Sequence, residues 1–421
     1  MPDALNLTGI ALTVNQGKWK RLAKSVAKNS LQPLAAQIDQ EGSYPRASLK
    51  AVADAGLMGL LMPKEYGGPG EGILTYAMVL EELAQGCAST AMVYCMHAST
   101  LPMIAALVKE NQVEAFAKPI VEGRWIGALA MSEPGSGNRL WHMDSYAQRN
   151  GTGYIIDSFK SFCTSCGQAD FYVVPVRADS TVAPTELSLF LIDGKDPNIL
   201  PIGKWDGMGL RGNCSMPIHF KGCHVSELAR LGSPTCGFSM LFAYSLPIYQ
   251  VGLATCYLGI AQAAYDAAVE HVKKRVHSDT KMPLSQVETV QRYIAEMKMR
   301  VDEARCMVYR VAQMSDNAMV LFNELHSADL LDEIIRENPD DPYFIELAQL
   351  KFAVNEIAVE VASKAFQVCG GTAYKRGHPV ERHVRDARAG SVMAPSDDSL
   401  KLIVGRQILG IPQPWDGDAR R

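Results

Sequence analysis

Two short segments hold side chains suited to binding a flat, polar ligand. The segment "ALAMSEPGSGN" (128–138) offers the Ser132 hydroxyl, and Gly135 and Gly137 let backbone N–H groups approach a ligand closely. The later segment "KSFCTSCG" (160–167) has Phe162 and Thr164 two positions apart, so on a strand an aromatic ring and a hydroxyl face the same way. Such a pair suits a planar, hydrogen-bonding cofactor. Taken singly, the first segment is also typical of a plain turn and the second of a half-buried strand.

A third segment, "RDARAGSVMAPSDDSLKLIVGR" (385–406), brings carboxylates to the start of a helix. Pro395 is favoured at a first helical position, and the helix dipole stabilises Asp397 and Asp398 in the first turn. Because this environment favours the ionised carboxylate, it lowers the pKa and weakens either residue as a base. Each of these two aspartates could accept a proton or could simply stabilise the start of the helix, and the sequence leaves both interpretations open. The charged cluster just upstream, around Glu381 and Arg385, favours salt bridges that hold one helix to another.

The elements that must position these segments follow from the hydrophobic pattern. Apolar residues recur at helical spacing in blocks from about residue 16 to 125, broken by the Gly- and Pro-rich loop "MPKEYGGPGEG". Short β-branched and aromatic runs follow, separated by Gly, Asp, Asn and Pro, as in an antiparallel sheet or small barrel. Helical periodicity returns over about 240–275, 286–320 and 344–369, and a last helix starts near Pro395. We expect a mainly α protein with a β-domain, divided into an N-terminal helical domain (1–125), a middle β-domain (126–237) and a C-terminal helical bundle (238–421).

Taken together and in order, these segments resemble the acyl-CoA dehydrogenase family. The resemblance rests on "MPKEYGG", "SEPGSGN", "FCTS", "LGIAQAAYDAAVEHVKKR" and "FQVCGG" with "RDAR", and it covers about residues 45–410. It implies an N-terminal helical domain, a middle β-sandwich or barrel and a C-terminal four-helix bundle. FAD would bind between the middle and C-terminal domains, commonly at an interface of a homotetramer. A carboxylate would remove the α-proton of an acyl-CoA thioester while the β-hydrogen leaves as hydride to flavin N5.

The resemblance also assigns positions along the flavin. "SEPGSGN" matches the family's "TEPGAGS" and "FCTS" matches its "WITN", so Phe162 would stack on the isoalloxazine and Thr164 would approach its N5 edge. Arg275 matches an arginine that contacts the neighbouring subunit's FAD, although Ser278 and Asp279 replace the family's Phe-Gly. The positions expected at FAD are Leu129, Met131, Ser132, Gly137, Phe162, Thr164, Arg275, Gln367, Val368, Gly371, Ser396 and Asp398.

The position of the family's catalytic glutamate holds Ala394. The family's "Y-E-G-T" reads Met393-Ala394-Pro395-Ser396 here, and Arg385 and Arg406 keep the family's separation. A second family position for the base, ten residues before Gly259, is Tyr249, and the arginine that usually follows is Gln250. The positions expected at the thioester are Asn138, Tyr249, Gln250, Met393 and Ala394.

Four residues are candidates to replace the missing base: Asp397, Asp398, Tyr249 and His97. Tyr249, with an ordinary pKa of about 10, fits better as a hydrogen-bond donor. An imidazole titrates near neutrality, but His97 in an apolar segment is more simply a hydrogen-bonded core histidine.

Composition excludes several classes of protein. The formal net charge of -4 and the dispersed Lys and Arg residues do not predict a nucleic-acid-binding surface. No apolar run of membrane-spanning length and no secretory signal are evident, so we expect no membrane insertion and a cytoplasmic location. Ten cysteines spread from Cys87 to Cys369 are typical of reduced thiols. Cys163 and Cys166 have metal-ligand spacing, but no second pair completes a site, so we expect no metal.

The sequence therefore predicts an FAD-dependent oxidoreductase acting on an acyl-CoA or carrier-bound acyl thioester, by α,β-dehydrogenation. Electrons would pass to an acceptor flavoprotein or to O₂, and the enzyme would be a homodimer or homotetramer. Because Ala394 cannot accept a proton, two alternatives stay open. One is a flavin-dependent oxygenase or oxidase of the same fold, acting on a CoA thioester or a small molecule. The other is a thioester- or FAD-binding protein without redox turnover.

Overall fold

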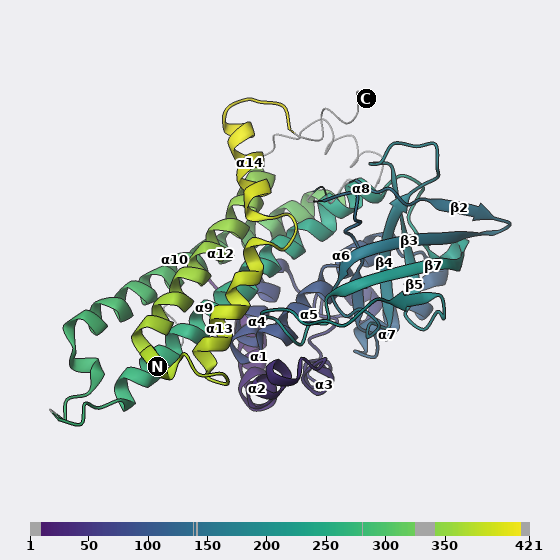
Figure 1. Ribbon diagram of the computed structural model, residues 1–421. Coiled ribbons are helices and arrows are strands. Elements are labelled where there is room, and N and C mark those ends of the chain that lie inside the picture. The colour runs from purple at the N-terminus through teal and green to yellow at the C-terminus, as the bar shows by residue number, and fades with distance from the viewer. Residues whose placement is uncertain (1–9, 138, 140–141, 280, 325–341, 414–421) are drawn as a thin grey trace.

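The computed structural model describes residues 10–137, 139, 142–279, 281–324 and 342–413. In chain order a β-domain separates two sets of helices, and in space both sets pack together beside it (Figure 1). The strands gather on one side of the molecule, and the long helices run away from them. The helices before the strands are α1 (Val14–Val26), α2 (Gln32–Glu41), α3 (Arg46–Asp54), α4 (Ile73–Gly86), α5 (Ala88–Ala98), α6 (Leu101–Leu107) and α7 (Lys118–Val121). A π-helical turn, η1 (Ala27–Leu31), joins α1 to α2.

The β-domain consists of two four-stranded sheets packed face to face. The first has the order β1-β4-β5-β8, with β1 (Gly127–Leu129), β4 (Phe171–Arg177), β5 (Leu187–Asp193) and β8 (Arg230–Leu231). The second has the order β2-β3-β7-β6, with β2 (Ala147–Asn150), β3 (Gly153–Cys163), β7 (Met216–Ser226) and β6 (Ile199–Pro201). Tyr172 and Phe220 meet edge to face between the sheets, with ring centroids 5.5 Å apart. The expected β-sandwich is confirmed, except that β1 pairs with β4 in parallel.

The first sheet is covered on both sides, which explains the unbroken apolar run of β4. Tyr172, Val174 and Val176 face the second sheet, whereas Phe171 and Val173 face a cluster that includes Leu101 and other helical residues. Alternate side chains of a strand point to opposite faces, so a strand between two layers must be apolar throughout. The β-domain is thereby fixed against helices that precede it and helices that follow it.

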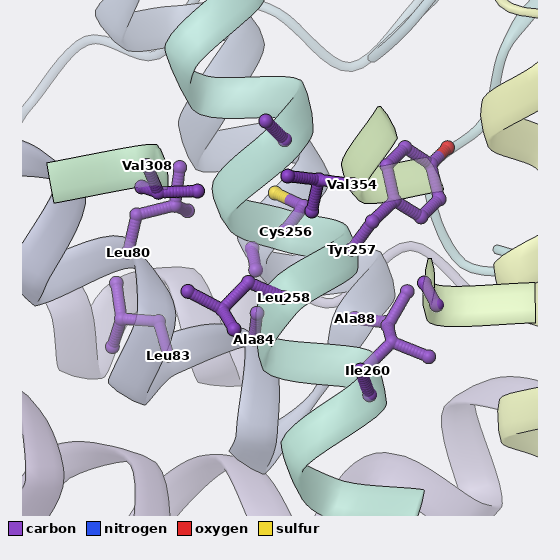
Figure 2. Close-up of a cluster of buried hydrophobic side chains, with 14 of the residues drawn as sticks. Leu80, Leu83, Ala84, Ala88, Cys256, Tyr257, Leu258, Ile260, Val308 and Val354 are labelled. Carbon is purple, nitrogen blue, oxygen red and sulfur yellow. The ribbon is translucent and has the colours of Figure 1, made fainter. Parts of the chain in front are cut away.

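The C-terminal helices form a bundle that shares its core with α4. They are α8 (Gly237–Met240), a π-helical turn η6 (Leu241–Ser245), α9 (Leu246–Lys274), α10 (Glu288–Glu324), α12 (Pro342–Cys369), α13 (Pro379–Arg388) and α14 (Asp397–Ile408). Figure 2 shows side chains of α4 and α9 packing together with Val308 of α10 and Val354 of α12. Gly259 makes this approach possible, because a Cβ added there would lie 2.4 Å from that of Ala84. The predicted C-terminal bundle is confirmed.

Two helical stretches correct the expectation about apolar runs. Ala88–Leu107 and Gly237–Lys274 are long and apolar enough to cross a membrane by length and composition alone. However, 78% and 83% of these windows are buried inside the fold, as expected for core helices. Their hydrophobicity therefore serves the core of this molecule.

The predicted salt bridges between helices are present at α13. Arg385 donates to both carboxylate oxygens of Asp39 in α2, at 2.8 and 2.6 Å, and also pairs with Glu381 one turn earlier. Asp386 is buried and accepts a hydrogen bond from the Leu210 backbone N–H at 2.7 Å. Burial raises the pKa of Asp386 to about 6. These contacts tie α13 to α2 and to the loop between β6 and β7.

Candidate active site

A cavity of about 1990 Å³ lies between the β-domain and the C-terminal helices. Its middle-domain wall comes from the segment after β1, the end of β3 and the loop between β6 and β7. Its C-terminal wall comes from α8, η6 and the starts of α9 and α12, together with the loop at 389–395 and α14. Small-molecule pockets are typically 300–1,000 Å³, so this cavity has room for a large cofactor together with a substrate.

The middle-domain wall brings together six of the residues predicted to contact a flavin. Leu129, Met131, Ser132, Gly137, Phe162 and Thr164 all line the cavity. The backbone N–H of Ser161 donates to the Ser132 carbonyl oxygen at 2.7 Å, which joins the two predicted segments side by side. Phe162 is 63% exposed, which leaves its ring available to stack on a ligand. Asn138, predicted to contact the thioester, lies outside the described residues.

Glu133 fixes the turn of this wall from behind. Its carboxylate accepts hydrogen bonds from the Asp144 and Ser145 backbone N–H groups, from the hydroxyls of Ser145 and Ser158, and from Lys160 Nζ at 2.8 Å. Burial by itself raises the pKa of Glu133, but Lys160 and the Ser145 hydrogen bonds outweigh burial and lower that pKa to about 2. Lys160 is fully buried and also donates to the Pro175 carbonyl oxygen. This carboxylate is therefore a structural anion rather than a base.

Asn213 adds an unsatisfied acceptor to the same wall. It is 3% exposed, lines the cavity, and its Oδ1 has no hydrogen-bond partner among the described residues. A buried amide oxygen without a donor costs free energy, but this oxygen is closed to the cavity and is not offered to a ligand. The wall fits a flavin by its aromatic ring and its hydroxyls.

The C-terminal wall contains the four described residues predicted at the thioester: Tyr249, Gln250, Met393 and Ala394. The Tyr249 hydroxyl donates to the Ala394 carbonyl oxygen at 2.6 Å. Burial raises the pKa of Tyr249 above its ordinary value, so the side chain keeps its proton and acts as a donor. Among the described residues of this wall there is no carboxylate.

Lys351 of α12 holds the loop that carries Ala394. Its side chain is fully buried, and Nζ donates to the carbonyl oxygens of Gly390 at 2.7 Å, Met393 at 3.1 Å and Pro395 at 3.0 Å. Nζ also pairs with Asp397 Oδ1 at 2.9 Å, and Asn355 donates to the same oxygen at 3.0 Å. Burial lowers the pKa of Lys351, and the Asp397 carboxylate opposes that shift. The loop is therefore fixed through its backbone.

Asp397 and Asp398, two of the candidates for the base, lie away from the cavity lining. The Asp397 carboxylate is buried and bound by Lys351 and Asn355, and it does not line the cavity. Asp398 is exposed in the first turn of α14, also away from the cavity lining. Ser396, predicted at FAD, caps α14, because its hydroxyl accepts from the Ser399 backbone N–H. Both aspartates therefore belong to the start of the helix.

The remaining predicted FAD residues lie at the other end of the bundle. Arg275 follows the last residue of α9, and Gln367, Val368 and Gly371 lie at the end of α12. None of them lines the cavity, which is contacted by the first turns of both helices. With 1.5 Å per residue, the 29 residues of α9 place Arg275 about 40 Å from Leu246. Arg275 therefore cannot contact a ligand held in the cavity of its own chain.

The other candidates for chemistry are structural. His97 is fully buried, accepts from the Gly127 backbone N–H at Nδ1 and lies 3.0 Å from the Met58 carbonyl oxygen at Nε2. Burial lowers the pKa of His97 to about 4, so the ring is neutral, as expected for a core histidine. Cys163 and Cys166 direct their thiols at the backbone carbonyls of Thr164 and Pro217. The described residues contain no cluster of three or more His, Cys, Asp or Glu that could hold a metal ion.

Comparison with known proteins agrees with the geometry. The family models described as acyl-CoA dehydrogenase N-terminal, middle and C-terminal domains match residues 13–124, 128–223 and 241–409. The chain belongs to the acyl-CoA dehydrogenase family. Enzymes of this family are FAD-dependent, and FAD is the cofactor of this member. The three-domain order is thus a family property.

Relatives cover nearly the whole acyl-CoA dehydrogenase fold. The chain is 29% identical over 387 residues to the mitochondrial short-chain specific acyl-CoA dehydrogenase of Homo sapiens, covering 92% of this chain and 88% of that protein. It is 28% identical over 402 residues to the cyclohex-1-ene-1-carbonyl-CoA dehydrogenase of Geobacter metallireducens, covering 94% and 99%. The butyryl-CoA dehydrogenase structure from Megasphaera elsdenii superposes with a TM-score of 0.84 at 27% identity, covering 95% of this chain and 99% of that one.

Proposed function

We propose that this chain is an FAD-dependent oxidoreductase that dehydrogenates an acyl thioester carried by CoA or by an acyl-carrier protein. The observation that carries the proposal is the large cavity in which the flavin-compatible residues of the middle domain face Tyr249 and Ala394. The names of the relatives support the substrate class, because they include short-chain, butyryl-CoA and cyclohexene-carbonyl-CoA dehydrogenases.

The middle-domain wall would hold the cofactor. The Phe162 ring offers a stacking surface, and the Ser132 and Thr164 hydroxyls offer hydrogen bonds. Leu129 and Met131 supply apolar contact, and Gly137, with φ of 56°, leaves room for a close approach of its backbone. FAD held there would supply the hydride acceptor for the β-carbon of the acyl group.

The C-terminal wall raises a second candidate function. Removal of an α-proton needs an acceptor, and among the described cavity residues the only carboxylates are Glu133 and Glu186, both on the middle-domain side. The Glu133 carboxylate is paired with Lys160 and hydrogen-bonded by the serines. The Glu186 carboxylate accepts a hydrogen bond from the Ala183 backbone N–H at 2.9 Å. A wall without a base favours, as the second candidate, a flavin-dependent oxidase or monooxygenase of the same fold that uses O₂.

We also propose that the enzyme works as a homodimer or homotetramer. Arg275, Gln367 and Gly371 are exposed at the end of the bundle remote from the cavity, where they can reach the FAD of a neighbouring copy. Light scattering on the purified protein tests this proposal, and a monomer with full FAD content would contradict it. Electrons would pass to an electron-transferring flavoprotein or to O₂, and the enzyme would be cytoplasmic.

One experiment separates the candidate reactions. The purified yellow protein is mixed with a panel of acyl-CoA thioesters, first without and then with O₂, while the flavin spectrum is recorded. Anaerobic bleaching by an acyl-CoA is expected for a dehydrogenase. Bleaching only by an external reductant, followed by O₂ uptake, would replace dehydrogenation with the oxidase or monooxygenase reaction. A protein that is colourless and takes up no FAD would contradict both.

A further inference from the structure

Three phenylalanines form an aromatic cluster on the C-terminal wall of the cavity. Phe238 comes from α8, Phe242 from η6 and Phe344 from the first turn of α12, and all three line the cavity. The Phe238 and Phe242 rings stack with centroids 4.4 Å apart. Phe242 and Phe344 meet edge to face, with centroids 6.1 Å apart and an angle of 71° between the ring planes. Segments distant in the sequence thus bring three rings together.

Two of these rings keep surface that a ligand can reach. Phe238 is 8% exposed, whereas Phe242 and Phe344 are only half-buried and both line the cavity. Because their planes are steeply inclined, this pair forms an aromatic corner, defined here as Phe242 with Phe344. A third ring placed in such a corner can stack on one ring and meet the other edge to face, which are the arrangements that aromatic side chains prefer.

One helix face joins the aromatic corner to the thioester end of the cavity. Phe242, Leu246 and Tyr249 are four and three residues apart, so they share a face of η6 and α9, and all three line the cavity. With 1.5 Å per residue, Phe242 lies about 10 Å along the helix from Tyr249. The Tyr249 hydroxyl donates to the Ala394 carbonyl oxygen, at the predicted thioester position. The aromatic corner therefore lies where the far end of an acyl group of medium length would reach.

The surface beside the aromatic corner is apolar apart from one hydroxyl. Ser245 supplies that hydroxyl, whereas Glu346 pairs with Arg310 of α10 and does not line the cavity. Arg388 and the other polar side chains of this wall come from α9, from α13 and the loop after it, and from α14. The lining residues nearest to the corner in sequence are Leu241, Ser245, Leu246, Ile345, Leu347 and Ala348.

We propose that the aromatic corner selects a thioester whose acyl group carries an aromatic ring, in preference to an alicyclic or straight-chain acyl group of similar size. This inference rests on the proposed function and names its substrate class. Apolar burial alone does not favour a phenyl over a cyclohexyl group, because both remove a similar apolar area from water. The geometry of ring contacts does favour the phenyl group, and two such contacts raise affinity about 5- to 10-fold.

The test measures thioester binding to the FAD-loaded enzyme by anaerobic equilibrium dialysis, with the flavin reduced by dithionite so that no thioester is oxidised. The panel is 3-phenylpropanoyl-CoA, 3-cyclohexylpropanoyl-CoA and octanoyl-CoA. The phenyl ester is expected to bind at least fivefold tighter than the cyclohexyl ester. In the double variant Phe242→Leu with Phe344→Leu, that preference is expected to fall to within twofold while octanoyl-CoA binding is kept.

Phe322→Leu makes the same substitution on a ring of α10 that contacts Tyr244 and does not line the cavity, so it is expected to keep the wild-type preference. Equal affinities of the wild type for the phenyl and cyclohexyl esters would overturn the inference alone, and this measurement needs no variant. A preference that persists in the double variant would also overturn it, since the phenyl group would then bind elsewhere. If no thioester of the panel binds, the proposed function fails as well.

Discussion

Each of the two walls of the cavity is held by a buried lysine paired with a carboxylate, but the side chains that line the two walls differ. Behind the middle-domain wall, Lys160 pairs with Glu133 and donates to the Pro175 carbonyl oxygen. Behind the C-terminal wall, Lys351 pairs with Asp397 and donates to three carbonyl oxygens. Both lysines are fully buried. The first wall presents a ring and hydroxyls, whereas the second presents the methyl group of Ala394.

The comparison teaches that scaffold and chemistry are separable at this site. A buried lysine bound to a carboxylate fixes a backbone strongly, since removing one partner leaves an uncompensated charge. The middle-domain wall keeps the residues that suit a flavin, and the C-terminal wall keeps its frame without the acidic side chain. Cofactor binding and proton removal can therefore be tested independently.

The largest effect is expected when a base is returned to the C-terminal wall. In Ala394→Glu, a carboxylate on the fixed loop is expected to accelerate anaerobic flavin reduction by an acyl-CoA by about 10²- to 10⁴-fold, the usual contribution of a general base. Stopped-flow absorbance measures this rate. Ala394→Gln, of the same size without basicity, is the control, and equal rates in the two variants would show that position 394 cannot reach the α-proton.

A second test breaks the support of the C-terminal wall. Lys351→Met leaves the Asp397 carboxylate buried without its counter-charge, so the free energy of unfolding is expected to fall by about 3–5 kcal/mol. Urea denaturation measures the change. Adding Asp397→Leu to the same chain removes the orphaned charge and is expected to recover part of the loss. If the double variant were less stable than Lys351→Met, the pair would not be the source of the effect.

A third test uses pH to titrate the support of the middle-domain wall. The pKa of Glu133 is about 2 in the folded protein and near 4.5 in the unfolded chain, so its stabilisation is complete above pH 4.5 and is lost as the pH falls toward 2. Between pH 4.5 and 3 the wild type is expected to lose about 2 kcal/mol more than Glu133→Gln. Parallel stability curves for the two proteins would contradict the assigned pKa.

The smallest effect concerns the exposed face of the middle-domain wall. Phe162→Ala is expected to weaken FAD binding about five- to tenfold, because a stacked aromatic contact contributes about 1 kcal/mol. The stability of the apoprotein should change little, since the Phe162 ring is 63% exposed. Phe159→Ala, on the same strand but away from the cavity lining, is the control in a fluorescence titration with FAD. Equal FAD affinities in both variants would remove Phe162 from the flavin site.

Local pattern predicts most of the fold, whereas the family resemblance assigns most residues of the middle-domain wall. The helical blocks, the β-rich segment and the returning helices each have a period that a single segment displays. For Phe162 and Thr164 the spacing on a strand is itself a local signal, and both residues line the cavity. Val173 and Val174 face opposite layers, and the unbroken apolar run of β4 is the corresponding signal for burial on both sides.

The support of the C-terminal wall was missed because its partners are distant or are backbone atoms. Lys351 binds Asp397, which is 46 residues further along the chain. It also binds three backbone carbonyl oxygens, and because every residue has one, the residue types give no sign of this contact. One signal was available: Leu347, Lys351, Val354 and Ala358 have helical core spacing, so a lysine occupies a position where an apolar residue is expected. Without that signal, the position of Asp397 beside Ala394 makes it a candidate base.

The backbone anchoring of the 389–397 loop has an evolutionary consequence. Lys351 and Tyr249 donate hydrogen bonds to backbone carbonyl oxygens of this loop. Because every amino acid has a backbone carbonyl oxygen, a substitution at position 394 leaves these hydrogen bonds in place. A lineage can therefore exchange the side chain there without first redesigning the loop. Such a position tolerates neutral drift and then the gain of a new reaction, which makes the site a natural point of divergence within one architecture.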